Sequence, residues 1–143
     1  MGAVVDTTVF IGLEREEDRG RTANAGNIGR RLVACLGENE EAAMAAITAS
    51  ELLHGVHRAR IKHRARREAF VEAILSAIPV LDFDLLAARA HARIWADLAR
   101  AGSDVGPHDR LVAATAISLG WRVATANVRH FARIQGLEVT EVR

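Results

Sequence analysis

VGPHDRLVAATA, residues 105–116, is the stretch on which the interpretation of the whole chain depends. Gly106 ends a loop, and Pro107 has the restricted φ that suits the first turn of a helix. The apolar residues that follow, 111–116, predict a helix that is buried almost all round. Asp109 is the exception, because it places a carboxylate in the first turn of that helix. Two roles are open for it: it complements the helix dipole, or it holds a ligand.

The composition is that of a folded protein. The chain has 143 residues, half of them hydrophobic and only two of them proline, and this length suits one domain over residues 1–143. No apolar run approaches the roughly 20 residues that a membrane helix needs, and the N-terminus lacks the basic and apolar regions of a signal peptide. The single cysteine, Cys35, cannot form an internal disulfide, and we expect it in the core. These features predict a cytoplasmic protein.

Short apolar strands alternate with helices along the chain. Strands are predicted at 3–6, 42–48, 80–83, 122–126 and 137–142, and helices at 7–13, 28–36, 49–58, 61–78, 84–101 and from 107 onward. The polar residues 14–27 predict a loop. Strands separated by helices indicate an α/β fold with a mostly parallel central sheet and helices on both faces. In helix 84–101 the apolar spacing predicts one buried side, formed by Leu85, Ala88, Ala92, Trp95 and Leu98.

Polar side chains follow the ends of several predicted strands. They are Asp6, Thr48 with Glu51, Asp109, and Thr125 with Asn127. In open parallel sheets the ligand site lies beyond the carboxyl ends of the strands, so we expect these side chains at one edge. Carboxylate oxygens are the ligands that hard divalent cations prefer. The placements therefore indicate a metal site built from segments far apart in the sequence.

Each of these residues also has a purely structural interpretation. Asp6 suits the N-cap of the helix that follows it, and Asn127 suits the cap of a short turn. Thr48 and Glu51 have the spacing of a capping box, in which the glutamate reaches back to the cap amide. One shared site explains all of the placements together, whereas capping explains them one at a time.

The histidines give weaker signals. Glu51, His54 and His57 have a spacing that resembles metal ligation, but no second Glu-x-x-His element accompanies them, so we expect surface histidines. His108 and His130 are expected to face solvent, within reach of a substrate phosphate.

A basic run, HRARIKHRARR, covers residues 57–67. It is either a solvated helix face or a surface that attracts phosphates or an acidic partner. Within and beside it, the candidates for contact with RNA or a partner are Arg64, Arg66, Arg67 and Leu53.

Four motifs together resemble a known family. They are VVDTTVFI (4–11), ITASELLHGV (47–56), VGPHDRLVAATA (105–116) and VATANVRHFARIQGLEV (123–139), in this order and at suitable intervals. The chain resembles the PIN-domain ribonucleases, and within them the VapC-type toxins of bacterial toxin–antitoxin pairs. The resemblance runs from about Val4 to the C-terminus.

The resemblance implies a small α/β domain that binds Mg²⁺ or Mn²⁺ and cleaves single-stranded or structured RNA. By motif position, the family's acidic triad falls on Asp6, Glu51 and Asp109, which would be both catalytic residues and metal ligands. The family's hydroxyl after the first acid falls on Thr7. Its fourth acidic position falls on Asn127, an amide where many members have an acid, with Thr125 two residues before it in a supporting role.

The resemblance also implies partners. We expect a homodimer, for which helices 28–36 and 61–78 offer apolar surface. We expect a VapB-like antitoxin whose C-terminal tail docks along residues 49–67 and blocks the acidic site. The alternative is a catalytically degenerate PIN-like scaffold, which binds RNA or a protein without hydrolysis.

Overall fold

The computed structural model describes residues 1–17 and 25–142. A five-stranded sheet crosses the molecule in the order β3-β2-β1-β4-β5, and every neighbouring pair is parallel. The strands are β1 (Gly2–Val5), β2 (Glu41–Ala45), β3 (Val80–Leu81), β4 (Arg122–Thr125) and β5 (Val139–Glu141). Because β1 lies at the centre, with β2 and β4 beside it, its carboxyl end adjoins those of both neighbours.

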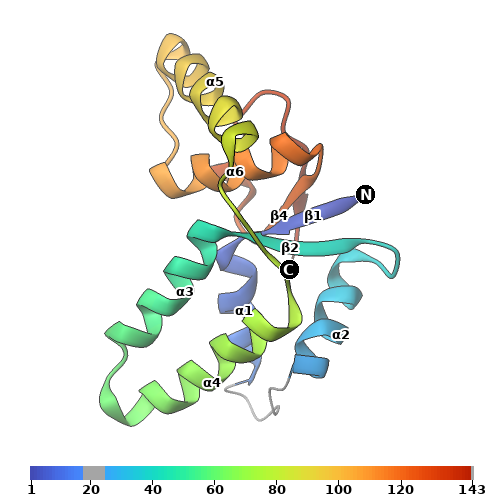
Figure 1. Cartoon of the computed structure of the whole chain (residues 1–143), viewed down its shortest axis with the longest axis vertical. Helices are drawn as coiled ribbons and strands as arrows, with labels where there is room; N and C mark the ends of the chain where they lie inside the picture. Colours follow the sequence, from blue (N-terminus) through green and yellow to red (C-terminus); the bar gives the residue numbers. More distant parts are fainter. Residues whose placement is uncertain (18–24, 143) are drawn as a thin grey trace.

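Helices cover both faces of the sheet (Figure 1). One face carries α1 (Thr7–Glu17), α2 (Ala25–Leu36), α3 (Ala46–Arg58) and α4 (Ile61–Ala77), and the other carries α5 (Leu85–Ala101) and α6 (Pro107–Leu119). A short 3₁₀ helix, η1 (Val128–His130), follows β4. The α/β fold with helices on both faces is confirmed, and the sheet is parallel throughout the described residues.

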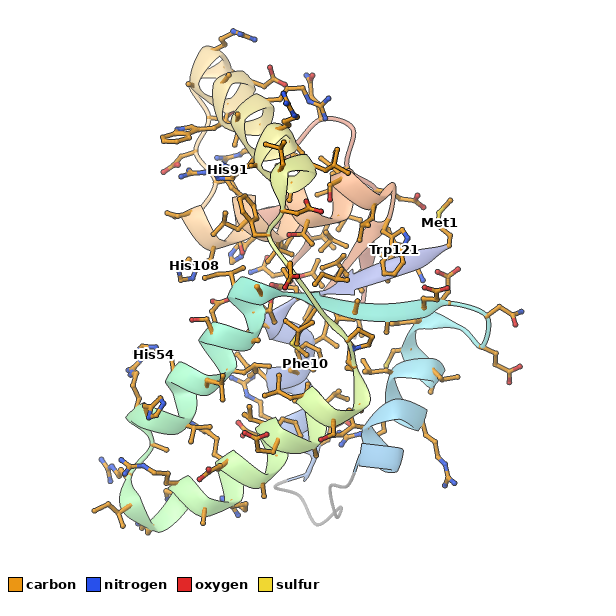
Figure 2. The ribbon with its side chains drawn as sticks, viewed as in Figure 1. Met1, Phe10, His54, His91, His108 and Trp121 are labelled. Carbon is orange, nitrogen blue, oxygen red and sulfur yellow. The ribbon has the colours of Figure 1, made fainter. Side chains whose placement is uncertain are left out.

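The two faces of the sheet form two separate hydrophobic clusters. Along β1, Val5 belongs to the cluster under α1–α4, which includes Phe10, and Val4 belongs to the cluster under α5 and α6, which includes Val112. Figure 2 shows Phe10 pointing into the first of these clusters. All of these side chains are at most 1% exposed. A strand that is buried on both faces of a sheet has a continuous run of apolar residues in its sequence, and β1 has such a run.

The boundaries of two predicted segments differ most from the structure. The strand predicted to reach Thr48 ends at Ala45, and α3 begins at once with Ala46. An alanine-rich apolar run fits a buried strand or a buried helix equally well, so its sequence did not locate the change. The loop predicted at 14–27 is shorter at both ends, because α1 continues to Glu17 and α2 begins at Ala25; residues 18–24 lie outside the described part.

The buried side of α5 also differs from the prediction. The residues that pack towards α6 are Ala87, Ala90, Ile94 and Leu98, whereas Leu85 is 66% and Trp95 is 58% exposed. Alanines on α5 and α6 let the two helices pack closely, so the contact selects small side chains rather than the largest apolar ones.

Cys35, expected in the core, is exposed on α2. No helix within residues 1–17 and 25–142 is long and apolar enough to cross a membrane.

Candidate active site

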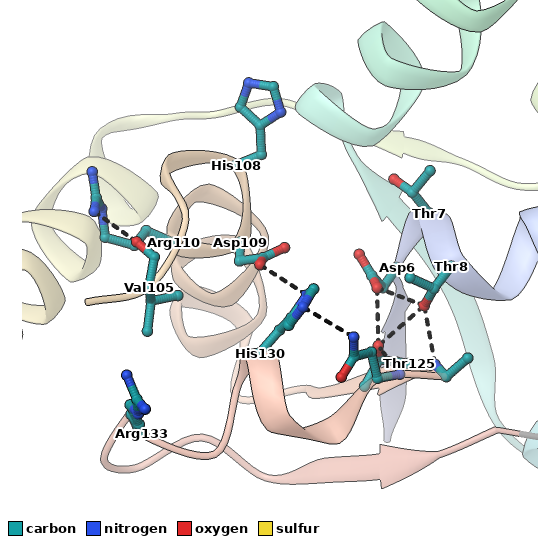
Figure 3. Close-up of polar contacts among 12 residues, drawn as sticks. Asp6, Thr7, Thr8, Val105, His108, Asp109, Arg110, Thr125, His130 and Arg133 are labelled. Atoms are coloured by element: carbon teal, nitrogen blue, oxygen red, sulfur yellow. Dashed lines mark hydrogen bonds and ion pairs between the residues drawn. The ribbon is translucent and has the colours of Figure 1, made fainter. Parts of the chain in front are cut away.

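The candidate site lies where β1 and β4 end and where α1, α3 and α6 begin (Figure 3). Asp6 directly follows β1, Glu51 lies in the second turn of α3, and Asp109 lies in the first turn of α6. The charges of Asp6 and Glu51 both act on the Asp109 carboxyl group, so the fold brings the three acids to one edge of the sheet. The prediction that Asp109 complements the dipole of α6 is also satisfied by this position.

Asp6 is held by hydroxyl groups from two elements (Figure 3). Its Oδ2 accepts hydrogen bonds from Thr8 Oγ1 at 2.7 Å and Thr125 Oγ1 at 2.9 Å. Each hydroxyl in turn accepts a backbone amide at 3.0 Å, Thr8 from Ala126 and Thr125 from Asn127. Each hydroxyl has one proton and directs it at Asp6, so the two hydrogen bonds hold this carboxylate in one orientation. They also replace the water that the carboxylate lacks, because it is only 4% exposed.

Glu51 is held from two other elements. Thr7 Oγ1, in the first turn of α1, donates to Glu51 Oε1 at 2.8 Å. His108 Nδ1, in the first turn of α6, lies 3.4 Å from Glu51 Oε2. The Glu51 side chain is 31% exposed and that of His108 is 56% exposed. The glutamate therefore keeps an open side towards solvent.

Asp109 contacts a histidine that is oriented by an amide. His130 Nδ1 lies 3.3 Å from Asp109 Oδ2, and Asn127 Nδ2 lies 2.9 Å from His130 Nε2 (Figure 3). An amide NH₂ group can only donate, so Nε2 is the acceptor and the proton of the neutral ring is on Nδ1, facing Asp109. The Asn127 contact thus favours the tautomer of His130 whose Nδ1 proton is on the side of Asp109.

The acids repel one another when no cation is bound. Burial raises the pKa of Asp109, and the negative charge of Asp6 and then that of Glu51 raise it further, while His130 and His108 oppose the shift. A positive ion among these carboxylates would remove that repulsion. The electrostatics therefore favour cation binding at this edge.

The donor set suits a hard divalent ion that keeps part of its water. Carboxylate oxygens, which all three acids carry, are ligands that Mg²⁺ and Mn²⁺ prefer. In the described part of the chain, no three acidic, histidine or cysteine side chains are close enough to form a complete ligand cluster. Mg²⁺ is commonly held by one or two carboxylates and several waters, so the open spacing fits this kind of ion.

The capping interpretations fail at two positions. Thr48 lies within α3 and not at a strand end; the N-cap is Ala45, which makes no side-chain cap bond, and the buried Thr48 hydroxyl has no partner among the described atoms. A capping box with Glu51 is therefore wrong. Asn127 stands at the N-cap of η1 without a side-chain cap bond, because its amide is bonded to His130.

Three residues of the site have roles that the sequence did not predict. Thr8 is not among the predicted site residues, and His108 and His130 are exposed as expected but also contact the acids, as Thr8 does. A hydroxyl two residues after Asp6 was the available signal for Thr8. For the histidines there was none, because the sequence does not show that η1 lies beside the start of α6. His54 and His57 are exposed as expected, and Figure 2 shows His54 pointing away from α3.

A groove of about 410 Å³ leads away from the acids, between α1 and the α3–α4 pair. It begins at Thr7 and Glu51, continues over apolar side chains, and has the Arg67–Glu14 ion pair (3.3 Å) in its lining. Its apolar lining is formed by Phe10, Ile11, Leu52, Phe70 and Val71. Leu52 lines this groove, whereas Leu53 does not.

The basic candidates differ in what they contact. Arg64 donates to the backbone carbonyl groups of Ala59 at 3.0 Å and His57 at 3.4 Å, so it stabilises the end of α3. Arg67 lines the groove, whereas Arg66 does not. Both line a second pocket at the α3–α4 turn.

Comparisons with known proteins agree with the geometry. The family model described as "PIN domain" matches residues 3–137. Ribonuclease VapC1 of Rickettsia felis is 36% identical over 143 residues, which cover 99% of this chain and 97% of that protein. The tRNA(fMet)-specific endonuclease VapC of Salmonella typhimurium is 39% identical over 98 residues, 68% of this chain and 73% of that protein. A solved structure of DNA-bound VapBC from Salmonella typhimurium superposes with a TM-score of 0.79 at 30% identity, covering 99% of this chain and 98% of that chain.

Proposed function

Because the chain belongs to the PIN-domain family, and within it to the VapC proteins, we propose that it is an endoribonuclease that acts as the toxin of a type II toxin–antitoxin pair. Asp6, Glu51 and Asp109 are the proposed catalytic residues. The observation that carries the proposal is their gathering at one sheet edge, where burial and then the negative charges of Asp6 and Glu51 raise the pKa of Asp109.

The same three carboxylates would hold Mg²⁺ or Mn²⁺. Such an ion, when bound, polarises a phosphoryl oxygen and lowers the pKa of a coordinated water. The protein's part is to keep the carboxylates in place. Thr8 and Thr125 fix Asp6, while His108 and His130 each contact one of the other two acids.

A cleavage assay tests this proposal. Purified protein is incubated with RNA and either Mg²⁺, Mn²⁺ or a chelator, and the Asp109→Asn variant is compared with Asp97→Asn. Asp97 is a matched control, since it lies on α5 and pairs with Arg100 at 3.1 Å. Loss of metal-dependent cleavage in Asp109→Asn alone supports the proposal, and full activity in that variant contradicts it. RNA binding without cleavage under any metal condition would favour the degenerate-scaffold alternative.

The groove beside Glu51 suits the tail of a VapB-like antitoxin. Its apolar lining and its two arginines, Arg15 and Arg67, match an amphipathic helix with acidic residues. A peptide bound in the groove would cover the path to the acids. Buried apolar anchors mainly set the lifetime of such a complex. Leu52→Ala should therefore speed dissociation of the antitoxin, whereas Leu53→Ala should not. Equal effects of the two substitutions would show that the tail docks elsewhere.

A homodimer would use the outer side of α5. Helices 28–36 and 61–78 were the expected surface, but their regularly spaced apolar residues are largely buried in the core. The exposed apolar side chains around α5 are Phe83 at 42%, Leu85 at 66%, Leu86 at 63% and Trp95 at 58%. Leu86→Glu should convert a dimer to a monomer in light scattering. A dimer that survives this substitution would exclude the α5 interface.

A further inference from the structure

A second pocket, of about 400 Å³, lies at the turn between α3 and α4. We call it the elbow pocket. Its lining includes Arg58, Arg60, His63, Arg66 and Arg67, with Glu14 as its acid. Glu14 is already paired with Arg67 at 3.3 Å. The pocket therefore carries an excess of positive charge.

Part of this positive charge has no partner among the residues that the structure describes. Arg58, Arg60 and His63 make no hydrogen bond or ion pair through their side chains with residues 1–17 or 25–142. Cations placed together repel one another. Arg60 is the N-cap residue of α4, whose first turn has no acid and where the helix dipole disfavours cations. Stability alone does not explain such a cluster, whereas an anionic ligand does.

The elbow pocket adjoins the groove that begins at the acidic site. Glu14 and Arg67 line both. Along α3, the seven residue steps from Glu51 to Arg58 correspond to about 10 Å. A chain bound at the carboxylates can therefore follow α3 as far as the elbow.

We propose that the elbow pocket binds a backbone phosphate of the RNA strand whose scissile phosphate lies at Asp6, Glu51 and Asp109. This inference rests on the proposed nuclease function. Among the described lining residues only Ala59 is apolar. An amphipathic peptide needs apolar anchors, which the groove has and the elbow lacks, whereas a phosphodiester chain needs repeated cationic contacts. Arginine is well suited to the second task because its guanidinium group binds phosphate in a bidentate manner.

Binding to RNA in the metal-free Asp109→Asn background tests the inference without cleavage. In that background, Arg60→Ala with His63→Ala should weaken binding to an RNA of about twelve nucleotides by about tenfold or more, and should affect a dinucleotide, whose single backbone phosphate cannot occupy both places, much less. The slope of log K against log salt should fall by about 0.7 for each phosphate that the variant no longer neutralises. Lys62→Ala is the matched control, because it removes a neighbouring positive charge that does not line the pocket.

The outcomes separate this inference from the proposed function. The elbow site would be overturned if the double variant, Arg60→Ala with His63→Ala, and the control Lys62→Ala weakened RNA binding equally. It would also be overturned if the double variant weakened the binding of long and short RNA equally. Unchanged RNA binding with weakened binding of an acidic antitoxin peptide would also overturn it, and would assign the pocket to the partner. If the wild-type protein does not cleave RNA but the length-dependent weakening is seen, the elbow site stands and the nuclease proposal fails. Thermal unfolding of each variant verifies that it is folded.

Discussion

The acidic site has two sides that are built differently. Asp6 is buried at the centre of the sheet, and two threonine hydroxyls donate to one of its oxygens. Glu51 and Asp109 lie on helices, remain 31% and 23% exposed, and contact histidines that are themselves about half exposed. The difference indicates that one carboxylate is set before any ligand arrives, while the other two can adjust to an ion or a phosphate.

This division has an electrostatic reason. A buried carboxylate is tolerated when charge-assisted hydrogen bonds replace its water, and Asp6 has two of them. Asp109 receives no such hydroxyl pair from the described residues, and its pKa is raised by burial and by its acidic neighbours. We therefore expect substitutions on the two sides to differ in stability even where they are alike in activity.

The largest expected effect is on cleavage. Asp6→Asn and Asp109→Asn should each lower kcat/KM by at least about 100-fold, because each removes a carboxylate proposed to hold the ion. Their stabilities should differ: Asp6→Asn should cost about 1–2 kcal/mol, since charge-assisted bonds become neutral ones, whereas Asp109→Asn should cost little or none. Urea unfolding together with the cleavage assay measures both quantities. Unfolding of Asp109→Asn would mean that its role is structural.

The threonines sharpen the comparison through stability. Thr125→Val keeps the shape of the side chain, but it removes a donor to Asp6 and an acceptor for the Asn127 amide, so we expect a loss of about 1–3 kcal/mol. Thr7→Val removes a donor to the partly exposed Glu51, where water can replace it, and should cost less than about 1 kcal/mol. Equal destabilisation in urea unfolding would contradict the distinction between the two sides.

The histidine contacts are expected to tune ligand affinity. His130→Ala should weaken Mn²⁺ binding by about tenfold, because the partners of metal-binding carboxylates hold them in orientation. Asn127→Ala should also weaken Mn²⁺ binding, but by less, since Asn127 acts only by setting the tautomer of His130. Calorimetric titration measures both, with the exposed His54→Ala as the control. An unchanged affinity in His130→Ala would show that Asp109 is oriented without it.

The smallest effect is a dependence of stability on pH. Because the pKa of Asp109 is raised from 3.8, the folded protein binds this proton more tightly than the unfolded chain does. The tighter proton binding stabilises the folded protein fully at pH values below the pKa of Asp109 in the unfolded chain. This stabilisation is lost as the pH rises through the pKa of Asp109 in the folded protein. Without metal, Asp109→Asn should thus gain stability relative to wild type as the pH rises above about 4, the ordinary pKa of an aspartate. Asp97→Asn should show no such trend, and the same trend in both variants would rule out this cause.

The sequence by itself determined the fold and the outline of the site. Alternating apolar strands and helices predicted the parallel sheet, and Asp6 and Thr125 were placed at its edge because they lie at the ends of strands. Asp109 could be placed too, since Pro107 marks the start of its helix. These predictions depend on local patterns and on one general property of parallel sheets, that their carboxyl ends lie together.

Contacts between distant segments were decided by the tertiary structure alone. The sequence did not show that His130 would meet Asp109, that Leu52 rather than Leu53 would line the groove, or that Trp95 would be exposed. Helical periodicity gives an average apolar direction, but the rotation of a helix against its neighbour depends on which side chains fit there. In α5 the fit to α6 selected Ala87 and Ala90, and the larger apolar residues were left on the surface.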